Sequence, residues 1–270
     1  MPLSLVPTPI GNLEDITLRA LRVLREADVI ACEDTRTSGI LLHHYDIKRP
    51  LTSFHVHNEN DKLGFLLEKL RRGEKVAVIS DAGTPGISDP GWILLKSAID
   101  EGIEAEVLPG PSALIPAVLL SGLNPQPFAF FGFPPEKHGE RVKLFEAVKN
   151  LTFTLCFYIS PHKAENHISD MISIFGDRNA ALIREISKIY QESIRGNLRT
   201  ILERLTQGVK GELVLVISGL ESESVNENWK SEAQAMNDEG MSVKDIVSKI
   251  ESKYGISRNE IRKYIIAFKK

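Results

Sequence analysis

Residues 76–91, VAVISDAGTPGISDPG, join a short apolar run to a loop that holds three glycines and two prolines. An apolar run without polar alternation, here Val76–Ile79, is typical of a strand buried on both faces of a parallel sheet. A strand–helix connection needs only about two to six residues, so this long, rigid loop indicates a second purpose. In open α/β sheets, ligands bind at the carboxyl ends of strands. The stretch therefore predicts a binding loop that begins at Asp81; the alternative is a structural turn in which Asp81 caps backbone amides.

Four other short apolar runs also end in unusual loops. The runs and their loops are 3–6 with 7–12, 29–32 with 33–36, 51–54 with 55–59, and 105–108 with 109–113. Two of these loops are again rich in proline and glycine, and two carry the charged or histidine clusters EDTR and HVHNE. Helical stretches separate the runs, as the spacing of Leu18, Leu21 and Leu24 indicates. Five strands alternating with helices predict a parallel sheet whose special loops share one edge.

The sequence changes character after residues 122–127, GLNPQP, which predict a domain linker. Further strands are predicted at 128–131, 151–159, 179–186, 189–194 and 212–217, with helices at 137–149, 161–174 and 198–207. In 151–159, apolar residues alternate with more polar ones, so one face of that strand is more buried than the other. We therefore expect an α/β protein with a parallel-sheet N-terminal domain at 1–122 and a mixed-sheet second domain at 123–220.

Composition narrows the class of protein. A chain of 270 residues argues for about two domains. It is 42% hydrophobic and 26% charged, which is ordinary for a globular protein. No apolar run approaches the ~20 residues of a membrane helix, and no basic, apolar leader opens the chain. Cys32 and Cys156 fall in predicted strands, which favours core residues over a disulfide or a metal site. We expect a cytoplasmic protein without membrane contact.

Charge is segregated along the chain. Residues 241–270 hold eight Lys or Arg and three Asp or Glu, a net +5, whereas residues 1–240 hold 25 and 33, a net −8. Ser242 to Asp245 and Ser257 to Glu260 have capping-box spacing, and a turn at 254–256 separates the two helices that they begin. A basic helix–turn–helix-like module at 228–270 is therefore predicted, with nucleic acid as its expected partner. The alternative is a basic helical hairpin that only packs on the body.

Several common ligand motifs are absent. No GxGxxG follows the first strand, and the sequence contains no GxxxxGK[ST] phosphate loop, no zinc-ligand spacing and no GxSxG elbow. The predicted crevice must therefore bind its ligand with prolines, small residues and exposed backbone groups.

The motif SDAGTPGISDPG at 80–91 resembles the signature of the ribosomal RNA small subunit methyltransferase I family, within the tetrapyrrole-methylase-like (class III) methyltransferases. Further similar runs are YISPHK at 158–163, REISK at 184–188 and RG at 195–196, so the resemblance covers roughly residues 3–219. The chain departs from the family pattern at Ile159, where an acidic residue is usual, and at Lys163, which replaces Arg. The resemblance implies two α/β domains with a cofactor cleft between them.

The resemblance also implies S-adenosylmethionine as cofactor. This ligand has no phosphate and needs no Lys or Arg cradle, and its sulfonium loses its charge as the methyl leaves, so a dry pocket does not oppose transfer. The residues that the resemblance assigns to the cofactor are Pro9, Ile10, Gly11, Asp81, Gly83, Thr84, Pro85, Ser112, Ala113 and the backbone near Ile159.

The implied reaction is 2′-O-methylation of a cytidine in small-subunit (16S) ribosomal RNA by a homodimer. A ribose hydroxyl gains from a positioned base, worth about 10²–10⁴-fold. Candidates at the strand ends are Glu33, Asp34, His55, His57 and Glu59. Asp34, beside Arg36, is expected to orient the hydroxyl, because an adjacent Arg makes a carboxylate a weaker base. His57 is the alternative proton acceptor, and Arg36 holds Asp34 or an RNA phosphate.

Other interpretations remain open at this stage. The pair of histidines in HVHNE allows a metal site, although no further ligands are evident and no metal is predicted. One rival function is a corrin or porphyrin C-methyltransferase, which the basic C-terminal module and the HVHNE and SPHK runs disfavour. The other is a non-catalytic RNA-binding assembly factor, which the intact SDAGTP and PGPSA loops disfavour.

Overall fold

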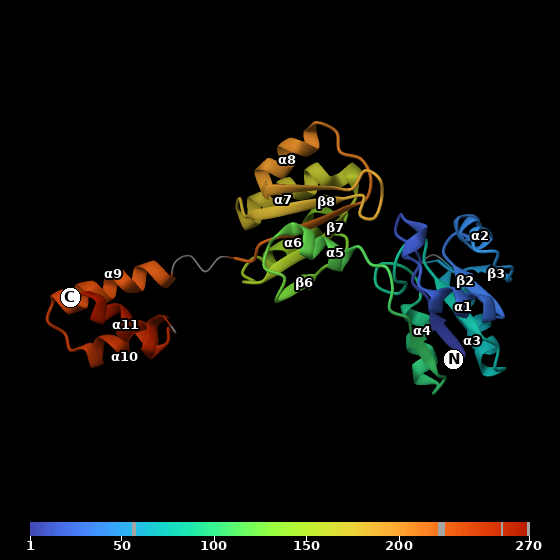
Figure 1. The fold of residues 1–270 in the computed structure, drawn as a ribbon, viewed down its shortest axis with the longest axis horizontal. Coiled ribbons are helices and arrows are strands. Elements are labelled where there is room, and N and C mark those ends of the chain that lie inside the picture. The colour runs from blue at the N-terminus through green and yellow to red at the C-terminus, as the bar shows by residue number, and fades with distance from the viewer. Residues whose placement is uncertain (56–57, 221–224, 255, 269–270) are drawn as a thin grey trace. The chain divides into compact units, whose positions relative to one another are not determined.

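The computed structural model describes residues 1–55, 58–220, 225–254 and 256–268. The chain forms two compact units, Met1–Ser218 and Gly219–Lys270 (Figure 1). The first unit contains two separate five-stranded sheets, and the second is helical. The α/β class predicted from the sequence, with one parallel and one mixed sheet, is confirmed.

The first sheet is fully parallel, with the strand order β3-β2-β4-β1-β5. Its strands are β1 (Leu3–Leu5), β2 (Val29–Cys32), β3 (Leu51–Ser53), β4 (Val76–Ile79) and β5 (Ala105–Val107). All five match predicted strands, although β1, β3 and β5 end one residue earlier than expected. The central strand β4, which opens the quoted stretch, is buried at every residue.

Helices cover both faces of this sheet. On one face lie α1 (Leu18–Glu26) and α2 (Thr35–His44), and on the other lie α3 (Glu59–Arg71) and α4 (Trp92–Asp100). Helix α1 begins after Thr17, whose side chain accepts a hydrogen bond from the Ala20 N–H. Ala20 and Leu24 face the core, whereas Leu18 is 86% exposed, so the predicted apolar face of α1 is correct at Leu24 and wrong at Leu18.

The second sheet is mixed, with the order β6-β7-β10-β8-β9. Its strands are β6 (Phe128–Phe130), β7 (Thr154–Ile159), β8 (Asn179–Arg184), β9 (Glu192–Asn197) and β10 (Leu213–Ile217). Strands β6 and β7 are parallel, and the other pairs are antiparallel. The strand predicted at 189–194 is displaced: it begins at Glu192, and Ile189 and Tyr190 lie in an exposed turn before it.

One helix covers one face of the second sheet and three cover the other. Helix α5 (Leu114–Ser121) packs on the first face, and α6 (His138–Val148), α7 (Ala164–Phe175) and α8 (Leu198–Thr206) pack on the second. Single 3₁₀ turns, η1 (Leu13–Asp15) and η2 (Pro161–Lys163), precede α1 and α7, so the helix predicted from 161 begins as a 3₁₀ turn. Both cysteines are buried thiols, as predicted.

The C-terminal unit has its own core. Helices α9 (Val225–Asp238), α10 (Val243–Tyr254) and α11 (Arg258–Phe268) surround the fully buried Trp229. The predicted cap is present, because the Asp245 N–H donates to Ser242 Oγ at 3.2 Å. Helix α9 already begins at Val225, so the predicted module start at 228 falls inside it. No helix in the described ranges is long and apolar enough to cross a membrane.

Candidate active site

The loops after β1 and β4 are joined by backbone hydrogen bonds at the carboxyl edge of the parallel sheet. Thr8 and Gly83 each donate an N–H to the other's carbonyl, at 2.9 and 3.0 Å. The buried Thr8 hydroxyl also donates to the Ser80 carbonyl at 3.0 Å. The sequence places Thr8 beside prolines that have no N–H, so these few bonds hold the loop. The two loops therefore form one rigid surface.

The loop after β5 completes this surface. The Thr84 hydroxyl donates to the Pro111 carbonyl at 3.2 Å. Gly83 has a φ of +82°, and a Cβ built on it would lie 3.4 Å from Ile10 Cγ2 and 3.7 Å from the Pro111 oxygen. A Cβ at these distances would only make ordinary contacts, so it is the positive φ, and not a lack of space, that favours glycine at residue 83.

The predicted cofactor residues therefore come together in this part of the fold. They are Pro9, Ile10, Gly11, Asp81, Gly83, Thr84, Pro85, Ser112 and Ala113, on the loops after β1, β4 and β5.

The second sheet borders this surface. Ile10 and Ala113 pack against a buried cluster that includes Cys156 and Val214. The side chain of Lys188 lies against Gly11, and the Ser187 hydroxyl donates to the Asp15 carboxylate. The Lys188 contact explains why residue 11 is glycine, because a Cβ there would lie 2.3 Å from Lys188 Cγ.

Ile159 differs from the other predicted cofactor residues. Its side chain is 1% exposed and belongs to the core on the far face of the second sheet, with α6 to α8. Tyr158 packs on the face that also carries Ile10 and Ala113. Only the backbone of Ile159 is therefore available to a ligand, in agreement with the backbone role that the resemblance implies for it.

Acidic side chains gather where β2 and β4 end. Asp81 Oδ1 accepts the Asp34 N–H at 3.3 Å, so it does cap one backbone amide, as the alternative interpretation expected. Burial raises the pKa of Asp81, and the Asp34 charge adds to this while the Asp34 N–H opposes it. Burial also raises the pKa of Glu33, followed by the charge of Asp81. This edge of the sheet is therefore electronegative.

Asp34 has a defined structural role. It is the N-cap of α2, and its carboxylate accepts the Arg36 N–H at 2.8 Å and the Arg36 Nη2 at 2.7 Å. Hydrogen bonds from the Arg36 side chain, then from its backbone, lower the pKa of Asp34 to about 2. A carboxylate with this pKa stays ionised and is a poor proton acceptor near neutral pH, but it can hold a hydroxyl in place.

The HVHNE loop is only partly described. His57 lies outside the described residues. The His55 N–H donates to Asn58 Oδ1 at 2.8 Å, and Glu59 begins α3. In the described ranges, no group of three or more His, Cys, Asp and Glu could hold a metal ion.

Sequence reasoning missed one residue in the loop from β4 to α4 and one at the start of α4. Asp89 is half-buried, and burial, followed by the charges of Glu33 and Asp81, raises its pKa to about 6, while a contact with the Ser80 hydroxyl opposes the shift. Trp92, the first residue of α4, is 57% exposed. Both border a cavity of about 490 Å³. The sequence signal that could have found them is a second carboxylate near the end of residues 76–91 and an aromatic residue directly after it.

Comparison with known proteins identifies the group to which this site belongs. The sequence profile of the Tetrapyrrole (Corrin/Porphyrin) Methylases matches residues 2–202. The chain is 45% identical to ribosomal RNA small subunit methyltransferase I of Streptococcus pyogenes serotype M1 over 223 residues, 82% of this chain and 78% of that protein. It is 41% identical to the protein of that name from Bacillus subtilis (strain 168) over 265 residues, 97% and 88% of the two chains. The chain belongs to the ribosomal RNA small subunit methyltransferase I family of tetrapyrrole methylases.

Solved structures of tetrapyrrole methylases share the fold of this methyltransferase. The methyltransferase CobJ aligns with a TM-score of 0.63 and 18% identity over 81% of this chain and 94% of its own. Uroporphyrin-III-C-methyltransferase from Thermus thermophilus aligns with a TM-score of 0.58 and 23% identity over 80% and 93%. At these identities the likeness concerns the fold alone.

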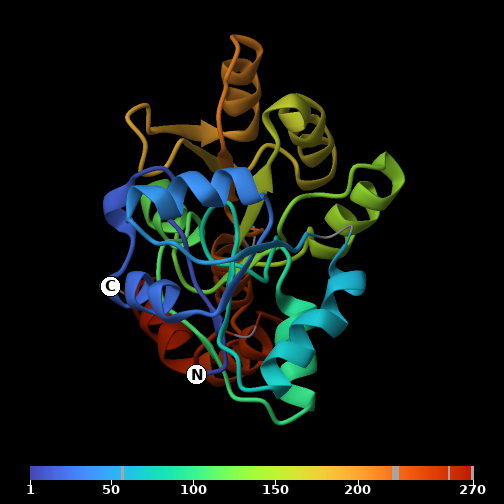
Figure 2. The same ribbon diagram turned by 90° about the vertical axis from the view of Figure 1, so that its right-hand side faces the viewer.

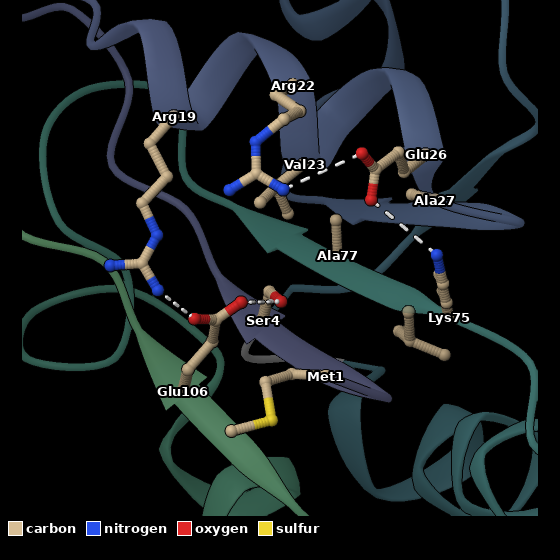
Figure 3. Close-up of a pocket in the computed structure, with 11 residues that line it drawn as sticks. Met1, Ser4, Arg19, Arg22, Val23, Glu26, Ala27, Lys75, Ala77 and Glu106 are labelled. Carbon is tan, nitrogen blue, oxygen red and sulfur yellow. Dashed lines mark hydrogen bonds and ion pairs between the residues drawn. The ribbon is translucent and has the colours of Figure 1, made fainter.

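A second cavity, of about 290 Å³, lies at the opposite, amino end of the parallel strands, beside Met1 and Lys75 (Figure 3). Its charged residues pair with one another: Glu26 lies 3.6 Å from both Arg22 and Lys75, and Glu106 binds Arg19 and the Ser4 hydroxyl. The charged side chains around this cavity are therefore engaged in ion pairs with one another.

Proposed function

We propose that this methyltransferase transfers the methyl group of S-adenosylmethionine to the 2′-hydroxyl of a cytidine ribose in small-subunit (16S) ribosomal RNA. The observation that carries the proposal is 41–45% identity to proteins named for methylation of that RNA, over 82–97% of the chain. The interlocked loops at the carboxyl edge support it, because they offer backbone groups and small side chains.

The donor set of these loops fits S-adenosylmethionine. The Thr8–Gly83 and Thr84–Pro111 hydrogen bonds hold the three loops together, and Asp81 supplies one carboxylate for the polar, amino-acid or ribose end of the ligand. We propose that Pro9, Ile10, Gly11, Ser112, Ala113 and the Ile159 backbone complete this site. The bound cofactor supplies an electrophilic methyl. The apolar contacts of Ile10 and Ala113 with the second sheet keep water from that end of the site.

We propose that Asp34 orients the acceptor hydroxyl. Its pKa of about 2 keeps it an acceptor of hydrogen bonds at any working pH, and Arg36 fixes its position through two side-chain hydrogen bonds. The Arg36 side chain is 88% exposed, so it can also meet a phosphate of the RNA. Glu33 lies close enough to Asp81 for their charges to interact, and its raised pKa makes it a better proton acceptor than Asp34. His57 remains the proposed alternative.

The decisive test is methylation of purified small subunits and of naked small-subunit RNA with methyl-labelled cofactor. Nuclease digestion and mass spectrometry of the nucleosides should show 2′-O-methylcytidine as the labelled product. Label on a base, or on a corrin or porphyrin offered in parallel, would refute the proposal. Binding of RNA without any transfer would indicate an assembly factor instead.

The C-terminal unit is proposed to bind RNA. Two of its basic residues form internal ion pairs, Lys253 with Glu232 and Arg258 with Glu251. In the part of residues 241–268 that the structure describes, Lys244, Lys249, Arg262 and Lys263 form no ion pair, so we propose them for phosphate binding. Ending the chain at Ser218, the boundary of the first unit, should weaken RNA binding and keep cofactor affinity. The slope of log affinity against log salt should fall by about one for each phosphate that the shortened chain no longer neutralises. An unchanged slope would exclude the tail from the RNA interface.

The same proposal includes a homodimer in the cytoplasm, as the family resemblance implies. Sedimentation equilibrium of the full chain should give twice the mass of 30.1 kDa. A monomer at micromolar concentration would contradict this part alone.

A further inference from the structure

The cavity of about 490 Å³ beside the β4–α4 loop has the size of a small-molecule site, which is about 300–1,000 Å³. Its walls are Glu59 at the start of α3, Trp92 and Ile93 at the start of α4, and residues 86–90 of the loop. Helices α3 and α4 lie side by side on one face of the sheet, and both begin at its carboxyl edge (Figure 2). The cavity therefore opens at the same edge as the three interlocked loops.

The rim of this cavity carries apolar side chains that the fold leaves uncovered. Trp92 is 57% exposed and Ile87 is 72% exposed. Later in α4, Leu94 and Ala98 are fully buried, so the helix has a core face and Trp92 lies off it. A tryptophan at this position offers a flat surface on which a base can stack, worth about 1–3 kcal/mol per base in nucleic-acid complexes.

Two carboxylates, those of Asp89 and Glu59, line the cavity. Asp89 is half-buried, and no ion pair joins it to a Lys or Arg in the described part of the chain. Glu59 lines the same cavity, and Glu33 and Asp81 lie near enough to act on Asp89 by charge. Carboxylates in and near the cavity disfavour a phosphate, so we expect the RNA backbone to stay outside. They accept hydrogen bonds from a group that only donates, such as the exocyclic amine of a base.

Residues at the second sheet lie near this cavity. Ser88 lines it, and a Cβ built on Gly132 would lie 3.9 Å from Ser88 Oγ. Tyr158 also comes within reach of the Asp89 charge, which is a cause of its raised pKa after burial. Phe133, the residue after Gly132, is 56% exposed. Phe133 packs against Tyr158 with ring centroids 5.4 Å apart, so an aromatic pair at the second sheet lies within reach of the Asp89 charge.

We propose that this cavity receives the target cytosine, extruded from its RNA stack, with Trp92 stacking on the base and the Asp89 carboxylate accepting a hydrogen bond from its N4 amine. This inference rests on the proposed function and names its specificity site. Asp89 lies near enough to Asp81 and Glu33 for their charges to act on it, so a base held by Asp89 lies next to the proposed cofactor loop and acceptor site. Enzymes that act on a base extrude it into a pocket and read it by stacking and hydrogen bonds, and we infer the same recognition here for an enzyme that acts on the ribose.

The carboxylate explains selection of cytosine over uracil. At the position of the cytosine N4 amine, uracil has the oxygen O4, which only accepts hydrogen bonds, as a carboxylate does. Two acceptors facing each other repel. An asparagine amide can both accept and donate, so it fits either base. Asp89→Asn should therefore relax selection without emptying the cavity.

The test compares four variants with the wild type on small-subunit RNA transcripts that carry either cytidine or uridine at the methylated position. Trp92→Ala should lower kcat/KM by about tenfold or more, and Trp92→Phe should recover most of the loss, because a stacked base contributes this much to affinity. Asp89→Asn should lower the cytidine-to-uridine ratio of kcat/KM by about tenfold. Ile99→Ala, at an apolar residue of α4 that is 55% exposed and lies outside the cavity lining, is the matched control and should change neither value. Cofactor affinity, measured by calorimetry, should stay constant throughout.

Any of the following three results would overturn the inference. An equal loss on both transcripts for Asp89→Asn would make Asp89 a proton acceptor rather than a base-recognition residue. Wild-type rates and ratios in both Trp92→Ala and Asp89→Asn would place the base elsewhere while leaving 2′-O-methylation intact. If the wild type methylates no cytidine ribose, the proposed function fails, and the inference fails with it.

Discussion

The loops after β2 and β4 end in carboxylates that face the same edge of one sheet, yet their environments are opposite. Asp34 is an N-cap with an arginine partner, and its pKa is lowered to about 2. Asp89 is half-buried beside two other carboxylates, and its pKa is raised to about 6. The Asp34 carboxylate accepts its hydrogen bonds from Arg36. The Asp89 carboxylate lacks a cation and borders a cavity, which is the usual condition of a group that meets a ligand.

Asp81 connects the two loops, because its carboxylate accepts the Asp34 N–H and its charge acts on Asp89. Asp81→Ala removes this link and the carboxylate proposed for the cofactor. We expect the affinity for S-adenosylmethionine to fall by about 10- to 150-fold, the value of one or two hydrogen bonds to a charged group. Calorimetry measures this directly.

Asp28→Ala is the matched control for Asp81→Ala. Asp28 also accepts one backbone N–H across the sheet, from Lys75 at 2.7 Å, but at the amino ends of the strands. Its removal should leave cofactor affinity unchanged. If Asp28→Ala and Asp81→Ala weaken the cofactor equally, the effect comes from stability, and Asp81 is only a cap.

Gly83→Ala tests the rigid part of the β4 loop. Alanine at a φ of +82° costs about 1–2 kcal/mol, and its Cβ meets Ile10 at 3.4 Å. We expect cofactor affinity to fall by about tenfold, since relief of the strain at residue 83 shifts the backbone that is hydrogen-bonded to Thr8 in the neighbouring loop. Gly73 has a φ of +80° with open space around a built Cβ. Gly73→Ala should therefore lower the melting temperature by about as much as Gly83→Ala does, and it should keep cofactor affinity. Equal affinity in the two variants would separate Gly83 from the cofactor site.

Asp34→Asn tests the loop after β2, in which the carboxylate is paired with Arg36. Asparagine caps helices as well as aspartate does, so α2 should persist, while the charged pair with Arg36 is lost. Turnover should fall by about tenfold, an effect of orientation, with cofactor affinity retained. Because Asp34 is ionised throughout the assay range, the loss should be the same from pH 6 to 9. A loss confined to one limb of the pH–rate profile would instead make Asp34 a titrating group in the reaction.

The sequence predicted the strands and the binding loops because both depend on local signals. Apolar runs such as Val76–Ile79 and the glycines and prolines of the β4 loop are visible without tertiary contacts. The partner of Asp34 was also predictable, because Arg36 is two residues away. The environment of Asp89 was not, since Glu33 and Asp81 come from other positions along the chain and burial is a tertiary property. Displacement of the strand predicted at 189–194 has a similar origin: Ile189 and Tyr190 favour a strand locally, but the structure leaves them exposed in a turn.

Asp89→Asn also tests the contrast between Asp34 and Asp89 through the free energy of unfolding. The pKa of Asp89 is higher in the folded protein, about 6, than the ordinary value of 3.8, so ionisation opposes folding. The penalty is absent below pH 3.8, grows as the pH rises toward 6, and is complete above 6. Two pKa units correspond to about 3 kcal/mol, but solvent screens a half-buried group, so we expect a gain in the free energy of unfolding of about 1 kcal/mol for Asp89→Asn at pH 8.

Denaturant unfolding of the wild type and Asp89→Asn at pH 4 and pH 8 measures this difference. At pH 4 the two proteins should be nearly equal, and at pH 8 the variant should be more stable. Asp34→Asn should have no such gain, because the pKa of Asp34 is lowered, so that its ionised form favours folding at both pH values. If Asp89→Asn is instead less stable at pH 8, the carboxylate is satisfied by its own chain as Asp34 is, and the contrast between the two loops disappears. A gain in stability together with lost selection between cytidine and uridine would show that the protein retains a destabilising charge for recognition.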